Sequence, residues 1–173
     1  MTTTPFLRRR QWLAAVAALT AARDGKAQQV LPPEAQMKWP ERTDLIDGRT
    51  RTAADWEGKP LLVVFWAVHC PFCLRHNAHL QRLLNERSDF PPVLTVAQDR
   101  HAATVERYLQ SHGYRFDVTL DEPTWRRALG VRRVIPSTVP VNAHGRIGLR
   151  VPGEMFLEDL LQLGQWANGA ART

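Results

Sequence analysis

Cys70 and Cys73, the only cysteines of the chain, stand three positions apart. Thiols at this spacing can form a disulfide with each other and exchange it with the disulfides of other molecules. A continuously apolar run precedes them at residues 61–67, which predicts a strand buried on both faces. A helical pattern follows over residues 71–86, so Cys70 would lie at the N-terminus of a helix. There the unpaired N–H groups and the helix dipole favour the thiolate, which is the nucleophilic form of cysteine.

The neighbouring residues also bear on what the pair does. Pro71 suits the first turn of a helix, where its missing N–H costs nothing. Cys73, one turn on, would lie inward and close enough to resolve a mixed disulfide on Cys70. His69 and His76 could complete a zinc site, but adjacent residues make poor joint ligands and the second ligand pair of a structural site is missing. A purely structural disulfide across so short a loop would add little stability, so redox exchange is the favoured interpretation.

The elements that would position this pair alternate between strands and helices. After the helix over residues 71–86, the sequence predicts a buried strand over residues 93–97 and a helix over residues 104–112 that Gly113 ends. The remaining predictions are a short helix that Thr124 caps and that ends at Gly130, a hairpin with arms at 138–142 and 146–151, and a helix over 155–167. This order predicts an α/β sandwich around one central sheet.

The first residues have the pattern of an export signal. Three arginines, residues 8–10, precede the 11-residue run Trp12–Ala22, which is too short to span a bilayer comfortably. We expect residues 1–27 to be a signal peptide cleaved after Ala27; an uncleaved membrane anchor and a packed N-terminal helix stay open as alternatives. The stretch Arg9-Arg10-Gln11-Trp12-Leu13 resembles a twin-arginine signal, although an ordinary charged leader fits as well. Export by either route would place the cysteines where disulfides persist.

Length and charge restrict the remaining possibilities. The 173 residues suffice for one domain, with 44% hydrophobic and 23% charged residues. The net charge is +6, of which the leader holds +4 and the remaining 146 residues only +2. Such a mild balance gives no support to nucleic-acid binding. We expect an extended lead-in at residues 28–40, because prolines occur there without periodicity, and a single domain at residues 41–170.

Several motifs in order resemble the thioredoxin superfamily, and within it the TlpA/ResA/DsbE branch of exported thiol–disulfide oxidoreductases. They are Gly58-Lys59-Pro60, Val64-Phe65-Trp66-Ala67, the Cys70–Cys73 pair, and Ile135-Pro136-Ser137-Thr138. Residues 44–48 are similar to the short N-terminal hairpin of that branch. The match covers residues 41–167, and it implies a thioredoxin-like sandwich with a central mixed β-sheet flanked by helices.

The resemblance also implies roles for single residues. Cys70 would attack substrate disulfides and Cys73 would resolve the mixed disulfide. Pro136 would follow a cis bond next to the cysteines, since proline makes that isomer accessible. The backbone of Ile135 would pair with the substrate as a strand does. Trp66 would shield the sulfurs as well as pack in the core, and Phe72 would contact the substrate. No cofactor and no metal is implied.

This sequence departs from the family pattern at several positions. Val64 stands where thioredoxin has a buried Asp, and His76 stands where the branch often has Glu. We expect His76 to help deprotonate Cys73, a role suited to imidazole, although a solvated helix histidine fits equally well. Pro140 lies in a predicted internal strand, where it deletes a ladder bond, so we expect a bulge. The lengthened loop before Pro136 should expose Arg132 and Arg133.

The direction of electron flow follows from the branch rather than from the residues. The resemblance favours a reductase that a membrane thiol transporter supplies with electrons and that acts on cytochrome c apoproteins or metal chaperones. Its partners would be protein disulfides and dithiols, with contact to the membrane only through an uncleaved leader. A disulfide oxidase or isomerase is the alternative with the same chemistry. A dithiol module that carries copper without turnover is the alternative from another class.

Overall fold

The structure, a computed structural model, describes residues 35–169. The predicted signal peptide at residues 1–27 and most of the lead-in at residues 28–40 therefore lie outside the described residues. Residues 35–40 form no regular element apart from one bridge, in which Gln36 pairs with Arg146.

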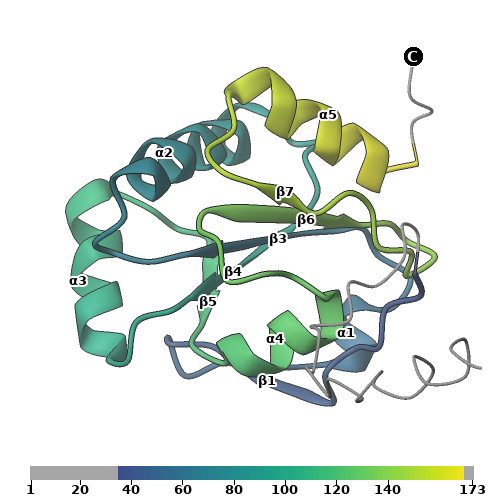
Figure 1. The fold of residues 1–173 in the computed structure, drawn as a ribbon, viewed down its shortest axis with the longest axis horizontal. Coiled ribbons are helices and arrows are strands. Elements are labelled where there is room, and N and C mark those ends of the chain that lie inside the picture. The colour runs from purple at the N-terminus through teal and green to yellow at the C-terminus, as the bar shows by residue number, and fades with distance from the viewer. Residues whose placement is uncertain (1–34, 170–173) are drawn as a thin grey trace, which may run out of the picture.

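A five-stranded sheet forms the centre of the molecule, in the order β5-β4-β3-β6-β7 (Figure 1). β3 pairs in parallel with β4, and β4 pairs in parallel with β5. β6 runs antiparallel to β3 on one side and to β7 on the other, so the sheet is mixed, as predicted. The strands are β3 Leu61–Trp66, β4 Val93–Ala97, β5 Asp117–Thr119, β6 Ser137–Val141 and β7 Val151–Pro152.

Helices cover both faces of this sheet. Figure 1 shows α2 and α5 over one face and α4 with the short α1 over the other, while α3 stands beside the end of α2. A separate hairpin, β1 with β2, precedes α1 and corresponds to the hairpin expected around residues 44–48. These elements are β1 Arg42–Asp44, β2 Thr50–Thr52, α1 Ala53–Trp56, α2 Pro71–Glu86, α3 Ala102–His112, α4 Glu122–Leu129 and α5 Leu157–Ala167.

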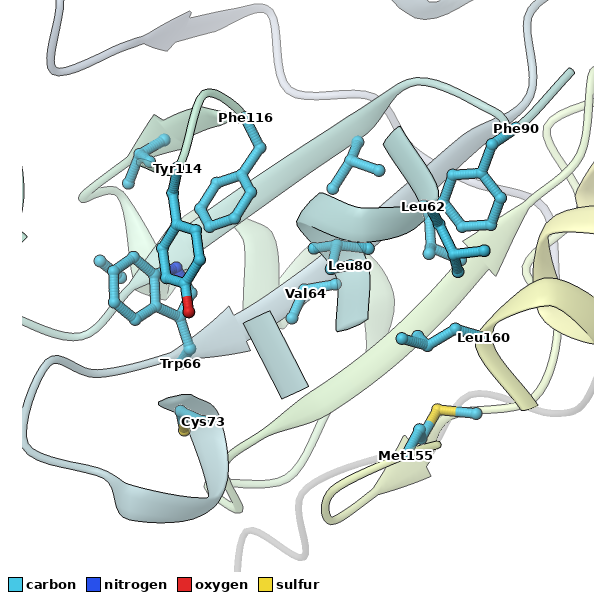
Figure 2. Close-up of a cluster of buried hydrophobic side chains, with 14 of the residues drawn as sticks. Leu62, Val64, Trp66, Cys73, Leu80, Phe90, Tyr114, Phe116, Met155 and Leu160 are labelled. Atoms are coloured by element: carbon cyan, nitrogen blue, oxygen red, sulfur yellow. The ribbon is translucent and has the colours of Figure 1, made fainter. Parts of the chain in front are cut away.

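Strand β3 divides the core into two clusters, because successive side chains of a strand point to opposite faces. Leu62, Val64 and Trp66 belong to the cluster under α2, α3 and α5. Their neighbours Leu61, Val63 and Phe65 belong to the cluster under α1 and α4. All six side chains are buried, which explains why the sequence shows a continuous apolar run here instead of an alternating one. Figure 2 shows the first cluster, with Cys73 at its edge near Trp66.

Several predicted boundaries differ from the structure. α3 begins at Ala102 instead of residue 104, and α5 begins at Leu157 instead of residue 155. The cap predicted at Thr124 is wrong. α4 begins at Glu122, because the side chain of Asp121 accepts a hydrogen bond from the Thr124 N–H and caps the helix. The predicted return arm at residues 146–151 is not a continuous strand. Arg146 forms a bridge with Gln36, and Ile147 forms one with Val141 at the end of β6, before β7 begins at Val151.

The bulge expected at Pro140 is wrong. β6 keeps a regular register against β3, with Pro140 opposite Leu62. The carbonyl of Pro140 accepts a hydrogen bond from the Gly148 N–H, on the side away from β3. Because the N–H and C=O of one strand residue point to the same side, the missing N–H of Pro140 also faces that outer side. The proline therefore removes no hydrogen bond between β3 and β6.

Candidate active site

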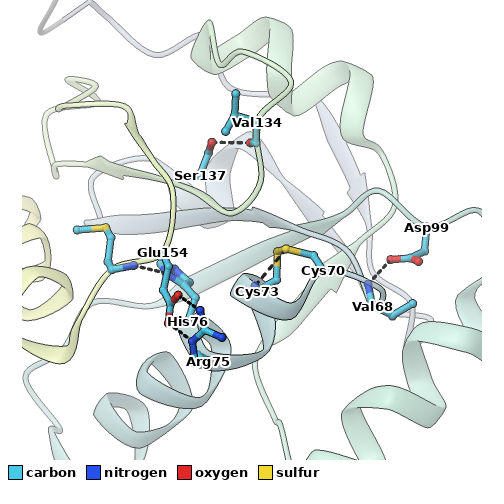
Figure 3. Close-up of a disulfide and its surroundings, with 10 residues drawn as sticks. Val68, Cys70, Cys73, Arg75, His76, Asp99, Val134, Ser137 and Glu154 are labelled. Carbon is cyan, nitrogen blue, oxygen red and sulfur yellow. Dashed lines mark hydrogen bonds and ion pairs between the residues drawn. A yellow bond between two sulfur atoms is a disulfide. The ribbon is translucent and has the colours of Figure 1, made fainter.

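The sheet brings the cysteine loop and the proline loop to the same edge. β3 ends at Trp66, four residues before Cys70, and β6 begins one residue after Pro136. The register pairs Phe65 with Ser137, so one step further along the ladder sets Trp66 opposite Pro136. The peptide bond between Ile135 and Pro136 is cis, which confirms the predicted isomer. Figure 3 shows Val134 and Ser137, which flank this peptide bond, in the surroundings of the disulfide.

The two cysteines form a disulfide with their Cα atoms 5.1 Å apart. Cys70 is the N-cap of α2, and its Sγ accepts a hydrogen bond from the Cys73 N–H at 3.1 Å. Pro71 occupies the first turn, as predicted. Cys70 is half-buried whereas Cys73 has no exposed surface, so only the first sulfur is open to another protein. A donated N–H and the helix N-terminus both favour the thiolate of Cys70 once the disulfide opens.

An acidic residue that the sequence analysis missed holds the segment before Cys70. The carboxylate of Asp99 accepts a hydrogen bond from the Val68 N–H at 3.1 Å. Next to it, the Gln98 N–H donates to the carbonyl of Trp66 at 2.9 Å. Asp99 lies two residues past the end of β4, the parallel neighbour of β3. The sequence could have identified Asp99 by this position, because it lies just beyond the predicted strand that follows the cysteine loop and its helix.

His76 is fully buried, so the alternative of a solvated helix histidine is wrong. Its Nδ1 accepts a hydrogen bond from the Met155 N–H at 3.1 Å, and its Nε2 lies 3.1 Å from the hydroxyl of Thr138. A backbone N–H can only donate, so Nδ1 is unprotonated and Nε2 carries the proton. Burial is the main cause that lowers the pKa of His76 to about 4, with a smaller contribution in the same direction from the nearby His79 and an opposing one from Glu154. The ring is therefore neutral near pH 7.

Side chains of α2 bind the segment that follows β7, at Glu154 and Met155. Arg75 forms an ion pair with Glu154, with Nε 2.7 Å from the carboxylate, and this hydrogen bond lowers the pKa of Glu154. His79 Nδ1 lies 3.1 Å from the carbonyl of Met155. Thus His76 and His79 hold both backbone polar groups of Met155. The sequence analysis missed Glu154 and His79, since no local pattern links them to the cysteines.

The residues predicted to contact substrate differ in their exposure. Phe72 is 56% exposed, and the guanidinium of Arg75 lies 5.2 Å from its ring centre. Ile135 is half-buried and packs against both core clusters. Trp66 has no exposed surface and packs against Tyr108 at 5.2 Å between ring centres, so it serves the core here instead of a substrate surface. Val134, which the sequence analysis did not single out, is 45% exposed beside Ile135.

Other functional expectations can be compared with residues 35–169. Val64 is buried in the core where thioredoxin has its Asp, so that position holds no carboxylate. In this part of the chain no three side chains of His, Cys, Asp or Glu lie close enough together to hold a metal ion. His69 is exposed, and the ring nitrogens of His76 contact Thr138 and Met155 instead of a ligand set with the cysteines. No helix among the described residues is long and apolar enough to cross a bilayer.

Comparison with known proteins agrees with this geometry. Residues 34–154 match the Redoxin family. The chain is 27% identical to the thiol-disulfide oxidoreductase ResA of Halalkalibacterium halodurans, over 68% of this chain and 69% of that protein. Among solved structures, the fold is shared by a secreted Mycobacterium tuberculosis disulfide oxidoreductase homologous to E. coli DsbE. The two chains are 18% identical and superpose with a TM-score of 0.61, over 72% of this chain and 94% of that one.

A DsbF homologue from Corynebacterium diphtheriae also shares the fold, with 18% identity, a TM-score of 0.67, and coverage of 82% of this chain and 94% of that chain. The match to the family covers more than half of the sequence, and it includes both cysteines and the cis-proline. The chain therefore belongs to the Redoxin family, and it is a thiol–disulfide oxidoreductase.

Proposed function

We propose that the chain is an exported reductase of protein disulfides. The thiolate of Cys70 attacks one sulfur of a substrate disulfide, forms a mixed disulfide and releases the first substrate thiol. The thiolate of Cys73 then attacks Cys70 Sγ, which restores the Cys70–Cys73 disulfide and releases the second substrate thiol. Two electrons and two protons pass to the substrate in each cycle. The observation that carries this proposal is the accessible, N–H-bonded sulfur of Cys70 next to the buried sulfur of Cys73.

Two features support export and a partner that supplies electrons. Residues 1–27 carry the charge and apolar pattern of a signal peptide. The solved Mycobacterium tuberculosis relative is described as secreted. Outside the cytosol a reductase needs its disulfide reduced after every cycle, so we propose a membrane thiol transporter as its electron donor. Cytochrome c apoproteins and metal-chaperone thiols are the proposed substrates.

The loop before β6 supports a strand-like contact with the substrate. Among the described residues neither the N–H nor the C=O of Ile135 takes part in a hydrogen bond, whereas the carbonyl of Pro136 already accepts one from the Gly153 N–H. The free backbone groups of Ile135 can therefore pair with an extended substrate segment, which gives affinity with little dependence on sequence. Pro136 sets the direction of this loop, and the exposed ring of Phe72, two residues after Cys70, offers an apolar contact.

The first test of this function is the reduction potential of the Cys70–Cys73 pair, measured by equilibration with glutathione or dithiothreitol. We expect a value near that of thioredoxin, about −270 mV, which suits a reductase. A value near the oxidising extreme, about −120 mV, would make the chain a disulfide donor and would overturn the proposed direction. Each shift of about 30 mV corresponds to about 1.4 kcal/mol between the two redox states. Tight binding of copper without any disulfide exchange would instead favour the metal-carrying module.

His76 is expected to assist resolution by holding the structure around Cys73. A ring with a pKa of about 4 is a weak acceptor for a thiol proton, and both ring nitrogens already have partners. We expect His76→Ala to slow the attack of Cys73 on the mixed disulfide by about tenfold to a hundredfold, because small displacements of reacting groups are costly. His76→Gln, which can donate and accept in the same places, should restore most of the rate in single-turnover experiments. If His76→Gln is as slow as His76→Ala, His76 acts as the base.

A further inference from the structure

Positive charge is concentrated in one part of the chain. Residues 123–153 contain six arginines and no aspartate or glutamate, so this segment alone carries a charge of +6. That equals the net charge of the whole chain, and the other residues together sum to zero. The segment includes the loop that leads into the cis-proline. Two of the six arginines, Arg132 and Arg133, lie in that loop beside the active site, whereas Arg126 pairs with Glu122 and Arg146 lies past the other end of β6.

The loop between α4 and β6 presents two of these arginines to solvent. Arg132, Arg133 and Val134 are all exposed, and they directly precede Ile135 and Pro136. In residues 35–169 the side chains of Arg132 and Arg133 form no ion pair and no hydrogen bond. The expected exposure of this basic pair is thus confirmed. Two unpaired cations next to the proposed substrate strand create a positive potential there.

Buried contacts hold this loop in one shape. Arg126, which is 5% exposed, donates to the carbonyl of Arg132, pairs with Glu122 and lies 4.8 Å over the ring of Phe65. The Val134 N–H donates to the same Arg132 carbonyl at 2.8 Å. At the far end of the loop, the hydroxyl of Ser137 donates to the Val134 carbonyl at 2.6 Å. The backbone is fixed from below, so binding does not have to order the loop itself, and only the two arginine side chains lose rotamer freedom.

The two acidic residues that flank residues 123–153 in the sequence, Glu122 and Glu154, are already engaged. Glu122 pairs with Arg126 beneath the loop, and Glu154 pairs with Arg75. Neither carboxylate therefore pairs with Arg132 or Arg133, whose guanidinium groups stay open to carboxylates of another molecule. Phe72 and Val134 add exposed apolar area close to the same edge of the sheet.

We propose that Arg132 and Arg133 form a docking surface for protein segments that carry acidic side chains close to their reactive cysteine. This inference rests on the proposed disulfide exchange and specifies its substrate class. The backbone of Ile135 aligns the segment, and the two arginines select for carboxylates in its continuation. Arg is suited to this role because its planar fork binds a carboxylate through two hydrogen bonds.

The test compares two synthetic disulfide peptides that differ only in having Glu or Gln beside the cysteines. The reduced full-length chain should react with the Glu peptide about tenfold faster at low salt, and the ratio should approach one near 1 M salt, where the Debye length is about 3 Å. In the double variant Arg132→Glu/Arg133→Glu, the ratio of the Glu-peptide rate to the Gln-peptide rate should fall to one or below.

The matched control carries Lys59→Glu and Arg87→Glu, which change the net charge equally. Lys59 precedes β3 at the end away from Trp66, and Arg87 follows α2 at the end away from Cys70. This control should keep the wild-type ratio.

Three results would overturn the inference. In the first, the wild type reacts with the Glu and Gln peptides at equal rates. In the second, the control variant loses the preference for the Glu peptide as much as the Arg132 and Arg133 variant does. In the third, Arg132 and Arg133 bind single-stranded DNA or anionic vesicles in a salt-sensitive way, and the wild type prefers neither peptide. The last result would assign the surface to a polyanion. The failure of the proposed function looks different, because the wild type would then react with neither peptide.

Discussion

Replacing Cys73 by serine is expected to stop turnover and to leave Cys70 joined to its substrate in a mixed disulfide. Cys70 keeps its accessible sulfur and its position at the N-cap of α2, so the first attack still occurs. The second attack needs a thiolate at the buried position one turn later, and a serine hydroxyl cannot supply it. Mass spectrometry of the reduced variant after reaction with a disulfide peptide should show the chain with one peptide strand attached. The rate of product release should fall to that of uncatalysed exchange.

Cys70→Ser is the matched control for this experiment. It keeps Cys73, but that sulfur has no exposed surface, so neither turnover nor a trapped adduct is expected. The assignment of attacking and resolving roles would be reversed if Cys70→Ser accumulated the adduct and Cys73→Ser did not. Continued turnover by Cys73→Ser would show that the chain does not need a resolving thiol of its own.

The sequence predicted those parts of the site that are set by neighbouring residues. α2 and β4 have the predicted bounds, because a helix start at Cys70 with Pro71 and a buried apolar run are local signals. The cis-proline loop could be recognised because the motif Ile135-Pro136-Ser137-Thr138 resembles that of the thioredoxin superfamily and lies directly before a predicted strand. Register then follows from the sheet, which brings Pro136 next to the end of β3.

Contacts between distant segments could not be predicted in this way. Met155 binds His76 from 79 positions along the chain, and Glu154 reaches Arg75 over the same separation. The burial of His76 depends on this contact, so its helical position alone left the solvated alternative open. Pro140 was misread for a related reason. Its effect depends on which side of β6 lacks a partner, and only the arrangement of β3, β6 and β7 decides that.

The buried His76 should make the folded chain sensitive to acid. Its folded-state pKa of about 4 lies below the ordinary histidine value of 6.5, because burial disfavours the charged ring. Between these two values the unfolded chain binds a proton at this position and the folded chain does not. The free energy of unfolding therefore falls as the pH is lowered from 6.5 towards 4, whereas above 6.5 this group contributes no pH dependence. The difference between the two pKa values of His76 corresponds to a loss of about 3 kcal/mol in the free energy of unfolding.

Urea unfolding at pH 7.5 and at pH 4 would measure this loss. In His76→Gln the glutamine cannot gain a proton, so the decrease in unfolding free energy between the two pH values should be smaller than in the wild type by about 3 kcal/mol. Comparing the two decreases removes any constant cost of the substitution itself. His144→Gln is the control, because His144 is exposed in the turn before Gly145 and its replacement should leave the wild-type decrease unchanged. Equal decreases in the wild type and His76→Gln would mean that protonated His76 is accommodated in the fold, and the hydrogen bond from Met155 to Nδ1 would then have to break at no net cost.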